Sequence, residues 1–142
     1  MNWLLSLFKS IVFQTVISGV LVFVLSEIIQ KFFLEPFQKY KKVIGEIDNQ
    51  LKFYANIIAN PDPTNTQIDL YKKCSGIMRR LSCKLESTYK QIPCKRLKTS
   101  EKISDAASRL IGLSNSLYQN SRDITNDDDV KEIRKDLNIP KL

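Results

Sequence analysis

The feature that most constrains this chain is an apolar stretch near its start. Residues 3–34 are mostly apolar, and no charged side chain occurs from Ile11 to Leu25. At a rise of about 1.5 Å per residue, a helix from Ile11 to Phe33 spans about 34 Å, enough for a hydrocarbon core of about 30 Å. The hydroxyls of Thr15 and Ser18 can bond to carbonyls of their own helix. We therefore predict that residues 1–36 form a transmembrane helix with its flanks.

A signal peptide and a buried core helix fit the apolar stretch less well than a span does. A cleaved signal peptide needs a basic first region and a small-x-small cleavage site, which Val24-Leu25-Ser26 does not supply. Because no cysteine precedes Cys74, a lipoprotein anchor is excluded. A buried helix of a soluble protein would need more chain around it than 142 residues offer.

The flanks of the apolar stretch predict its orientation. Lysines are more numerous after it (Lys31, Lys39, Lys41 and Lys42) than before it (Lys9). Positive side chains next to a span favour the cytoplasmic side, so the C-terminal body is predicted to be cytoplasmic. Aromatic and lysine side chains at both ends are typical of interfacial anchors. The predicted membrane-interface anchors are Trp3, Lys9, Lys31, Phe32, Phe33, Phe37 and Tyr40.

The rest of the chain, residues 37–142, has the pattern of amphipathic helices without strand alternation. Pro36 predicts a kink or short break after the span. Helices are predicted at about 37–59 and 65–91, a third after the cap candidates Thr99 and Ser100, and a short one capped by Asn126. The predicted fold is all-α, with one transmembrane helix followed by a cytoplasmic antiparallel helical bundle of three main helices and a short C-terminal helix.

The composition offers little for catalysis. There is no histidine, the four glycines form no phosphate-binding loop, and the three cysteines have no zinc spacing. Asp127, Asp128 and Asp129 suit a helix N-terminus better than a metal site. Cys94 lies beside Lys95 and Arg96, but no base accompanies it. We expect no enzyme activity, no catalytic residue, no cofactor or metal, and cysteines that stay reduced in the cytoplasm.

Positive charge is concentrated in the middle of the chain. The formal net charge is +7, and residues 72–109 hold eleven lysines and arginines but three carboxylates. A solvated face is the simplest interpretation. Contact with anionic lipid headgroups ranks next, since each basic residue near such a surface contributes about 1 kcal/mol. Nucleic acid and an acidic protein partner rank lower. The candidate residues for anionic-surface contact are Lys72, Lys73, Arg79, Arg80, Lys84, Lys95, Arg96 and Lys98.

Three short elements and a later helix carry a resemblance. They are KFFLEP (Lys31 to Pro36), KVIGEI (Lys42 to Ile47), FYAN (Phe53 to Asn56) and AASRLIGLSNSL (Ala106 to Leu117). The chain resembles a family of small uncharacterised bacterial single-pass membrane proteins that have such elements after an apolar span. The lysine- and cysteine-rich region from Tyr71 to Lys98 departs from that pattern. The resemblance implies a bacterial origin and a membrane-anchored helical domain, and no activity.

These observations predict a single-pass protein of the bacterial inner (plasma) membrane whose partners are the lipid bilayer and a protein or a second copy of itself. The favoured function is a helical interaction or scaffold module held at the membrane. The alternative is a membrane-perturbing effector, in defence or toxicity, that oligomerises through its span. Gly19 with Thr15 and Ser18 gives only a partial small-residue patch for such association.

Overall fold

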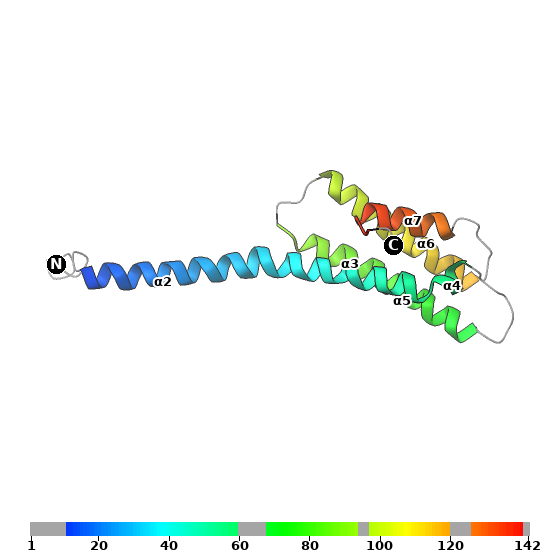
Figure 1. The fold of residues 1–142 in the computed structure, drawn as a ribbon, viewed down its shortest axis with the longest axis horizontal. Helices are drawn as coiled ribbons and strands as arrows, with labels where there is room; N and C mark the ends of the chain where they lie inside the picture. The colour runs from blue at the N-terminus through cyan, green and yellow to red at the C-terminus, as the bar shows by residue number, and fades with distance from the viewer. Residues whose placement is uncertain (1–10, 60–67, 94–96, 120–125, 141–142) are drawn as a thin grey trace. The chain divides into compact units, whose positions relative to one another are not determined.

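A computed structural model describes residues 11–59, 68–93, 97–119 and 126–140. These residues are mainly helical, and none of them lies in a strand (Figure 1). The all-α class predicted from the sequence is therefore confirmed. The chain divides into two compact units, Met1–Glu35 and Pro36–Leu142. We call the second the helical unit and describe each unit by itself.

The first unit contains the apolar helix α2 (Ile11–Ile29), which has no buried residue. It belongs to a helical stretch that is long and apolar enough to cross a membrane. The hydroxyls of Thr15, Ser18 and Ser26 donate to carbonyls four residues earlier, at 2.9, 2.7 and 2.8 Å. The bonds predicted for Thr15 and Ser18 are thus confirmed, and these three hydroxyls need no partner outside the helix.

A π-helical turn, η1 (Gln30–Leu34), follows α2 directly. The N–H of Glu35 donates to the carbonyl of Gln30, five residues earlier, and α3 (Glu35–Phe53) begins there with Pro36 as its second residue. The chain therefore stays helical through Pro36, and the predicted short break does not occur. Proline lacks an N–H and crowds the carbonyl four residues earlier. A π turn just before Pro36 changes that hydrogen-bond spacing, so the chain stays helical.

Four more helices follow α3 in the described part of the helical unit. They are α4 (Ala55–Ala59), α5 (Ile68–Lys90), α6 (Leu97–Gln119) and α7 (Asn126–Asp136). The predicted helix 37–59 is interrupted by a turn at Tyr54 that separates α3 from α4. The helix α5 lies within the predicted range 65–91, while α6 begins before the predicted caps.

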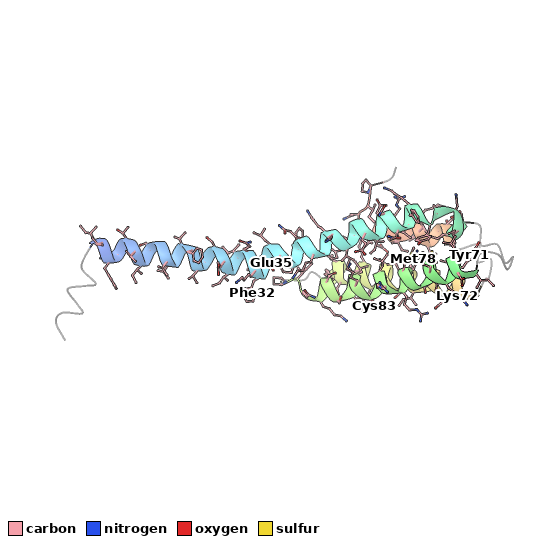
Figure 2. All side chains as sticks on the ribbon, turned by 90° about the horizontal axis from the view of Figure 1, so that it is seen from below. Phe32, Glu35, Tyr71, Lys72, Met78 and Cys83 are labelled. Atoms are coloured by element: carbon pink, nitrogen blue, oxygen red, sulfur yellow. The ribbon has the colours of Figure 1, made fainter. Side chains whose placement is uncertain are left out.

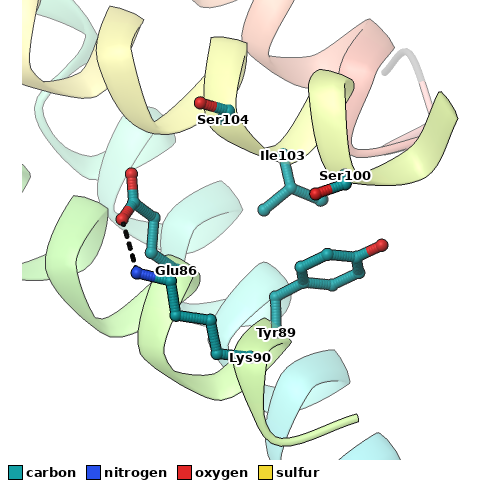
Figure 3. A pocket seen from close by; sticks show the side chains of 6 residues that line it. All are labelled: Glu86, Tyr89, Lys90, Ser100, Ile103 and Ser104. Carbon is teal, nitrogen blue, oxygen red and sulfur yellow. Dashed lines mark ion pairs between the residues drawn. The ribbon is translucent and has the colours of Figure 1, made fainter. Parts of the chain in front are cut away.

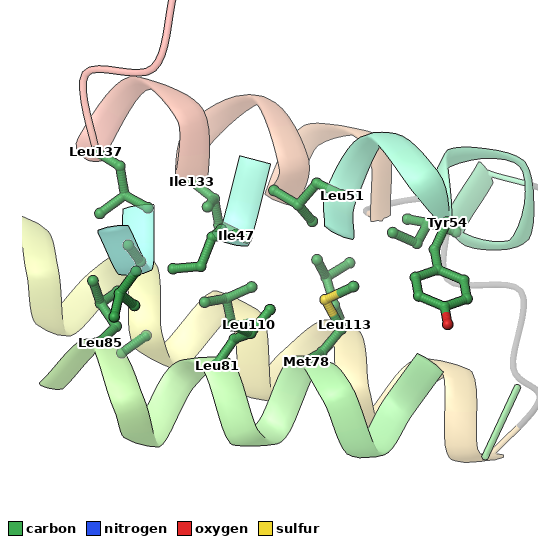
Figure 4. Packing of buried hydrophobic residues seen from close by; sticks show 14 of the residues in the cluster. Ile47, Leu51, Tyr54, Met78, Leu81, Leu85, Leu110, Leu113, Ile133 and Leu137 are labelled. Carbon is green, nitrogen blue, oxygen red and sulfur yellow. The ribbon is translucent and has the colours of Figure 1, made fainter. Parts of the chain in front are cut away.

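The apolar faces of these helices meet in one core, shown in Figure 4. The helix α5 packs along α6, and α6 packs along α7. Two hydroxyl bonds fix the direction of the first pair: Ser75 donates to the carbonyl of Ser114 and Ser82 to that of Ala107, both at 2.8 Å. The two helices therefore run in opposite directions. Fully buried side chains of the core include Ile47, Ile58, Met78, Leu85, Leu110, Leu113, Leu117 and Ile133.

Asn126 joins three helices instead of capping one. Its amide N–H donates to the carbonyl of Ile58 in α4 at 3.1 Å, and its amide oxygen accepts from the hydroxyl of Ser116 in α6 at 2.9 Å. The side chain, predicted as a helix cap, is thus occupied by contacts across the core. At the other end of α7, Asn138 adopts a positive φ of 53° and the N–H of Ile139 donates to the carbonyl of Arg134 at 2.8 Å. This left-handed cap ends α7 before Pro140.

Candidate functional site

The described residues at the C-terminal end of the apolar stretch include exposed aromatic side chains and a lysine. Phe32 and Phe33 are 65% and 52% exposed, and Phe32 is labelled in Figure 2. Lys31 forms an ion pair with Glu27 one turn earlier, at 3.7 Å. The ammonium of Lys41 lies 5.0 Å from the centre of the Phe37 ring, a cation–π contact.

Tyr40 differs from the other predicted anchors. Its ring is half-buried against the core of the helical unit, with its centre 5.7 Å from that of the Tyr89 ring. Burial, followed by the nearby Tyr89, raises the pKa of Tyr40 to about 12. The structure thus places Tyr40 in packing between α3 and α5, because it shares the inward face of α3 with Val43 and Ile47. Trp3 and Lys9 lie outside the described residues.

The exposed side of α5 is basic, and we call it the basic face of α5. Its exposed residues between 72 and 87 are Lys72, Lys73, Gly76, Arg79, Arg80, Cys83, Lys84 and Ser87. Figure 2 shows Lys72 and Cys83 on the side of α5 away from the buried Met78. The physical cause is helical periodicity: the apolar residues of α5 recur at three- and four-residue steps, which leaves the intervening cations facing out.

The cations of the basic face of α5 fall into two groups. Arg79 donates to the side-chain oxygen of Asn115 in α6 at 2.7 Å, and Lys84 forms an ion pair with Glu46 of α3. Lys72, Lys73 and Arg80 form no ion pair within the described part of the chain. The second group can therefore meet an anion without first breaking an ion pair with a described residue.

The remaining predicted basic residues are not placed by the structure. Lys95 and Arg96 lie outside the described residues, and of Lys98 only the backbone is described, in the first turn of α6. The basic site is thus described for the five residues on α5 alone. Their grouping on one helix face was predicted from the sequence, whereas the contacts to Asn115 and Glu46 were not, since both partners are distant in sequence.

Two of the three cysteines have contrasting surroundings. Cys74 is fully buried, and burial raises its pKa to about 12, so its thiol is protonated and inaccessible. Cys83 is an exposed free thiol in the basic face of α5. Cys94 lies outside the described residues. Cys74 therefore packs in the core as a small apolar side chain on the buried face of α5.

Aspartates of the acidic run at the start of α7 form ion pairs within the helical unit. Asp129 accepts a hydrogen bond from Arg109 at 2.7 Å, and Asp128 pairs with Lys131 at 2.8 Å. In the described part of the chain, no three Cys, Asp or Glu side chains are grouped so that they could hold a metal ion. Asp129 therefore joins α7 to α6, Asp128 pairs within α7, and both carboxylates suit the positive end of α7.

Sequence reasoning missed a charged contact between α3 and α7. Asp48 accepts a hydrogen bond from Arg134 and pairs with Lys52 at 2.7 Å. Burial acts to raise the pKa of the Asp48 carboxyl, but hydrogen bonds from Lys52 and Arg134 outweigh it, so the pKa lies below its ordinary value. Nothing in the sequence pairs residues 86 positions apart, and this link appears only once α3 and α7 are packed together.

A shallow hollow lies between the end of α5 and the start of α6. Figure 3 shows its lining, in which Tyr89 and Ile103 supply the apolar part and Glu86 pairs with Lys90 at 3.6 Å. Two serines, Ser100 and Ser104, complete it. The charge of Lys90 in this hollow is thus offset by Glu86 on the same helix. No family model, curated protein or solved structure matches this chain.

Proposed function

We propose that the chain is a single-pass membrane protein whose α2 crosses the bilayer and whose helical unit is a cytoplasmic bundle that acts as an interaction module. One observation carries the proposal: no residue of α2 is buried and nearly all of its apolar side chains are exposed, while most apolar residues of α3 to α7 are buried in a core of their own. An exposed apolar helix of this length is stable in hydrocarbon, where its backbone bonds and its hydroxyl bonds are already formed.

The proposed orientation in the membrane rests on the lysines that flank the apolar stretch. Lys31, Lys39, Lys41 and Lys42 follow the apolar stretch, and positive residues stay on the cytoplasmic side. We propose a bacterial inner membrane as the location, with a protein partner or a second copy of the chain as the ligand of the module. The module is proposed to act by placing a bound partner at the membrane, with no catalytic step of its own.

Alkaline extraction of membranes from cells that express the full chain tests the span. We expect the protein to remain in the membrane pellet. The double substitution Leu21→Arg with Val22→Arg should release it, because each arginine at the centre of a span costs about 2.5–3.5 kcal/mol. The matched control, Lys131→Arg with Lys135→Arg in α7, should stay in the pellet. Extraction of the unsubstituted chain would contradict the proposal.

The membrane-perturbing alternative predicts a different result in the same cells. An effector that oligomerises through α2 would depolarise the membrane on expression, and the loss would depend on Gly19. An interaction module leaves the membrane potential unchanged at equal expression. A potential-sensitive dye, read with the full chain and with Gly19→Leu, separates the two functions.

A further inference from the structure

We propose that the basic face of α5 binds the anionic headgroups of the membrane in which the chain is anchored. The inference rests on the proposed function, because it requires α2 to hold the helical unit at a bilayer. Its ligand is the phosphate-bearing surface of an anionic bilayer, and its contact residues are Lys72, Lys73 and Arg80, joined by Arg79 and Lys84 at the edges.

Charge is distributed unevenly between helices of the same unit. The helix α5 carries six lysines and arginines against two carboxylates, whereas α7 carries three against five. Between Asp69 and Glu86 the helix α5 has no acidic residue. The lysines and arginines between these two residues therefore form a stripe about four turns long with no acidic residue of α5 within it.

Three cations of the basic face of α5 are available to an external anion. Lys72, Lys73 and Arg80 form no ion pair with any described residue, in contrast with Lys84, which is held by Glu46. Exposed basic side chains whose charge is not neutralised within the fold gain most from an external anion. Each of them would contribute separately, as headgroup phosphates do not demand a fixed geometry.

The composition of the basic face of α5 distinguishes lipid from other anionic partners. The exposed residues of α5 between 72 and 87 include no aromatic and no large apolar side chain, and the exposed Ile68 and Leu70 lie before this stretch, in the first turn of the helix. Gly76 and Cys83 contribute no large side chain to the face. Protein interfaces depend on large anchors that fill pockets, and single-stranded nucleic acids stack on aromatic rings. A surface with charge but no anchors is suited to headgroups, which are bound by electrostatic attraction alone.

Tethering strengthens such binding through effective concentration. A module tethered to the bilayer meets headgroups at a high local concentration, so a few cations suffice for binding. The connection between the two units contains the π turn Gln30–Leu34 and Pro36. Both are features at which helices bend.

Cys83 provides a direct test because it is an exposed thiol on the basic face of α5, one turn from Arg79 and Arg80. The full chain with Cys94→Ser is placed in nanodiscs of phosphatidylcholine, or of phosphatidylcholine mixed with phosphatidylglycerol. The alkylation rate of Cys83 by an uncharged polyethylene glycol maleimide is then measured, with the buried Cys74 as an internal check on folding. We expect Cys83 to react about tenfold more slowly in the anionic discs, and high salt to restore the rate.

Matched variants locate the contact. Lys73→Glu with Arg80→Glu should remove most of the difference between the two lipids. Lys131→Glu with Lys135→Glu changes the net charge equally on α7 and should preserve it. A reporter on α6, Ser108→Cys in a chain with Cys83→Ser and Cys94→Ser, should react equally in both lipids.

Equal rates for Cys83 in the two lipids would overturn the inference, and so would protection that survives reversal of Lys73 and Arg80. Loss of the difference in the α7 variant would also overturn it, since net charge and not this face would then be responsible. A failure of the proposed function is visible earlier in the same experiment, because a chain without a span does not co-elute with the discs.

Discussion

Asn126→Ala gives the most informative test of how the helical unit is held together. Asn126 is 4% exposed and touches α4 and α6 from the first residue of α7. The substitution removes both hydrogen bonds of the amide and leaves the backbone of α7 unchanged. Since alanine is a good helix former, any loss of stability comes from the lost contacts.

The expected loss in the free energy of unfolding depends on which hydrogen-bonding groups keep a partner after the substitution. The Ser116 hydroxyl keeps its bond to the carbonyl of Leu113 at 3.0 Å, so it is not left without a partner. The carbonyl of Ile58 loses the amide donor at 3.1 Å inside the protein. An unsatisfied buried acceptor costs about 1–3 kcal/mol, and a lost hydrogen bond about 0.5–1.5 kcal/mol. We therefore expect a loss of about 2–3 kcal/mol in the free energy of unfolding.

Alkylation of Cys74 measures this loss without interference from the apolar helix. The full chain with Cys83→Ser and Cys94→Ser carries a single thiol, which is fully buried and reacts only when the core opens. In a regime of fast opening and closing, the labelling rate reports the free energy of opening. A loss of about 2–3 kcal/mol corresponds to labelling about 30- to 150-fold faster.

Asn49→Ala is the matched control, because Asn49 is exposed on α3. Its labelling rate should stay close to that of the parent chain. If Asn126→Ala changed the rate as little as Asn49→Ala does, the bridge between α4, α6 and α7 would not contribute to stability, and the reasoning would be wrong.

Three further predictions concern the same helices. Ile47→Ala should destabilise the helical unit by about 2–5 kcal/mol because Ile47 is fully buried. Phe53→Ala, at a site that is 75% exposed, should change the free energy of unfolding little. The labelling rate of Cys74 measures both changes. The folded-state pKa of Asp48 is lowered, so its contribution to stability is present above the ordinary carboxyl pKa and is lost as pH falls below about 4. Denaturant unfolding followed by circular dichroism should lose less stability between pH 6 and pH 3 with Asp48→Asn than with the parent chain, and an equal loss would refute this. In the native parent chain Cys83 should be alkylated readily and Cys74 only on unfolding, which mass spectrometry of the peptides can read; equal reactivity would contradict the burial of Cys74.

Much of the fold was predictable because its signals are local. Apolar residues at three- and four-residue steps predicted the helices, and in α5 the same steps leave the lysines and arginines on the exposed side. The boundary between α3 and α4 was missed, because a turn at Tyr54 leaves the apolar period of residues 43–58 intact. The π turn was missed for a similar reason, since Pro36 predicts a disturbance but not the hydrogen-bond pattern that absorbs it.

The long-range contacts were beyond sequence reasoning. Asp48 with Arg134, Lys84 with Glu46 and Asn126 with Ile58 depend on which helix faces lie together. A local pattern treats each of these side chains as a solvated residue or a helix cap. For the candidate site, the sequence therefore predicted the cations of the basic face of α5. It could not show which of these cations already contact another helix of the fold.

Labelling of Ser108→Cys in spheroplasts tests the central proposal of a span with a cytoplasmic helical unit most directly. The reporter is made in a chain with Cys83→Ser and Cys94→Ser; Ser108 is exposed on α6, outside the basic face of α5. A membrane-impermeant maleimide should leave intact spheroplasts unlabelled at this position and label inverted membrane vesicles. Labelling of intact spheroplasts, or recovery of the protein in the soluble fraction, would contradict the account.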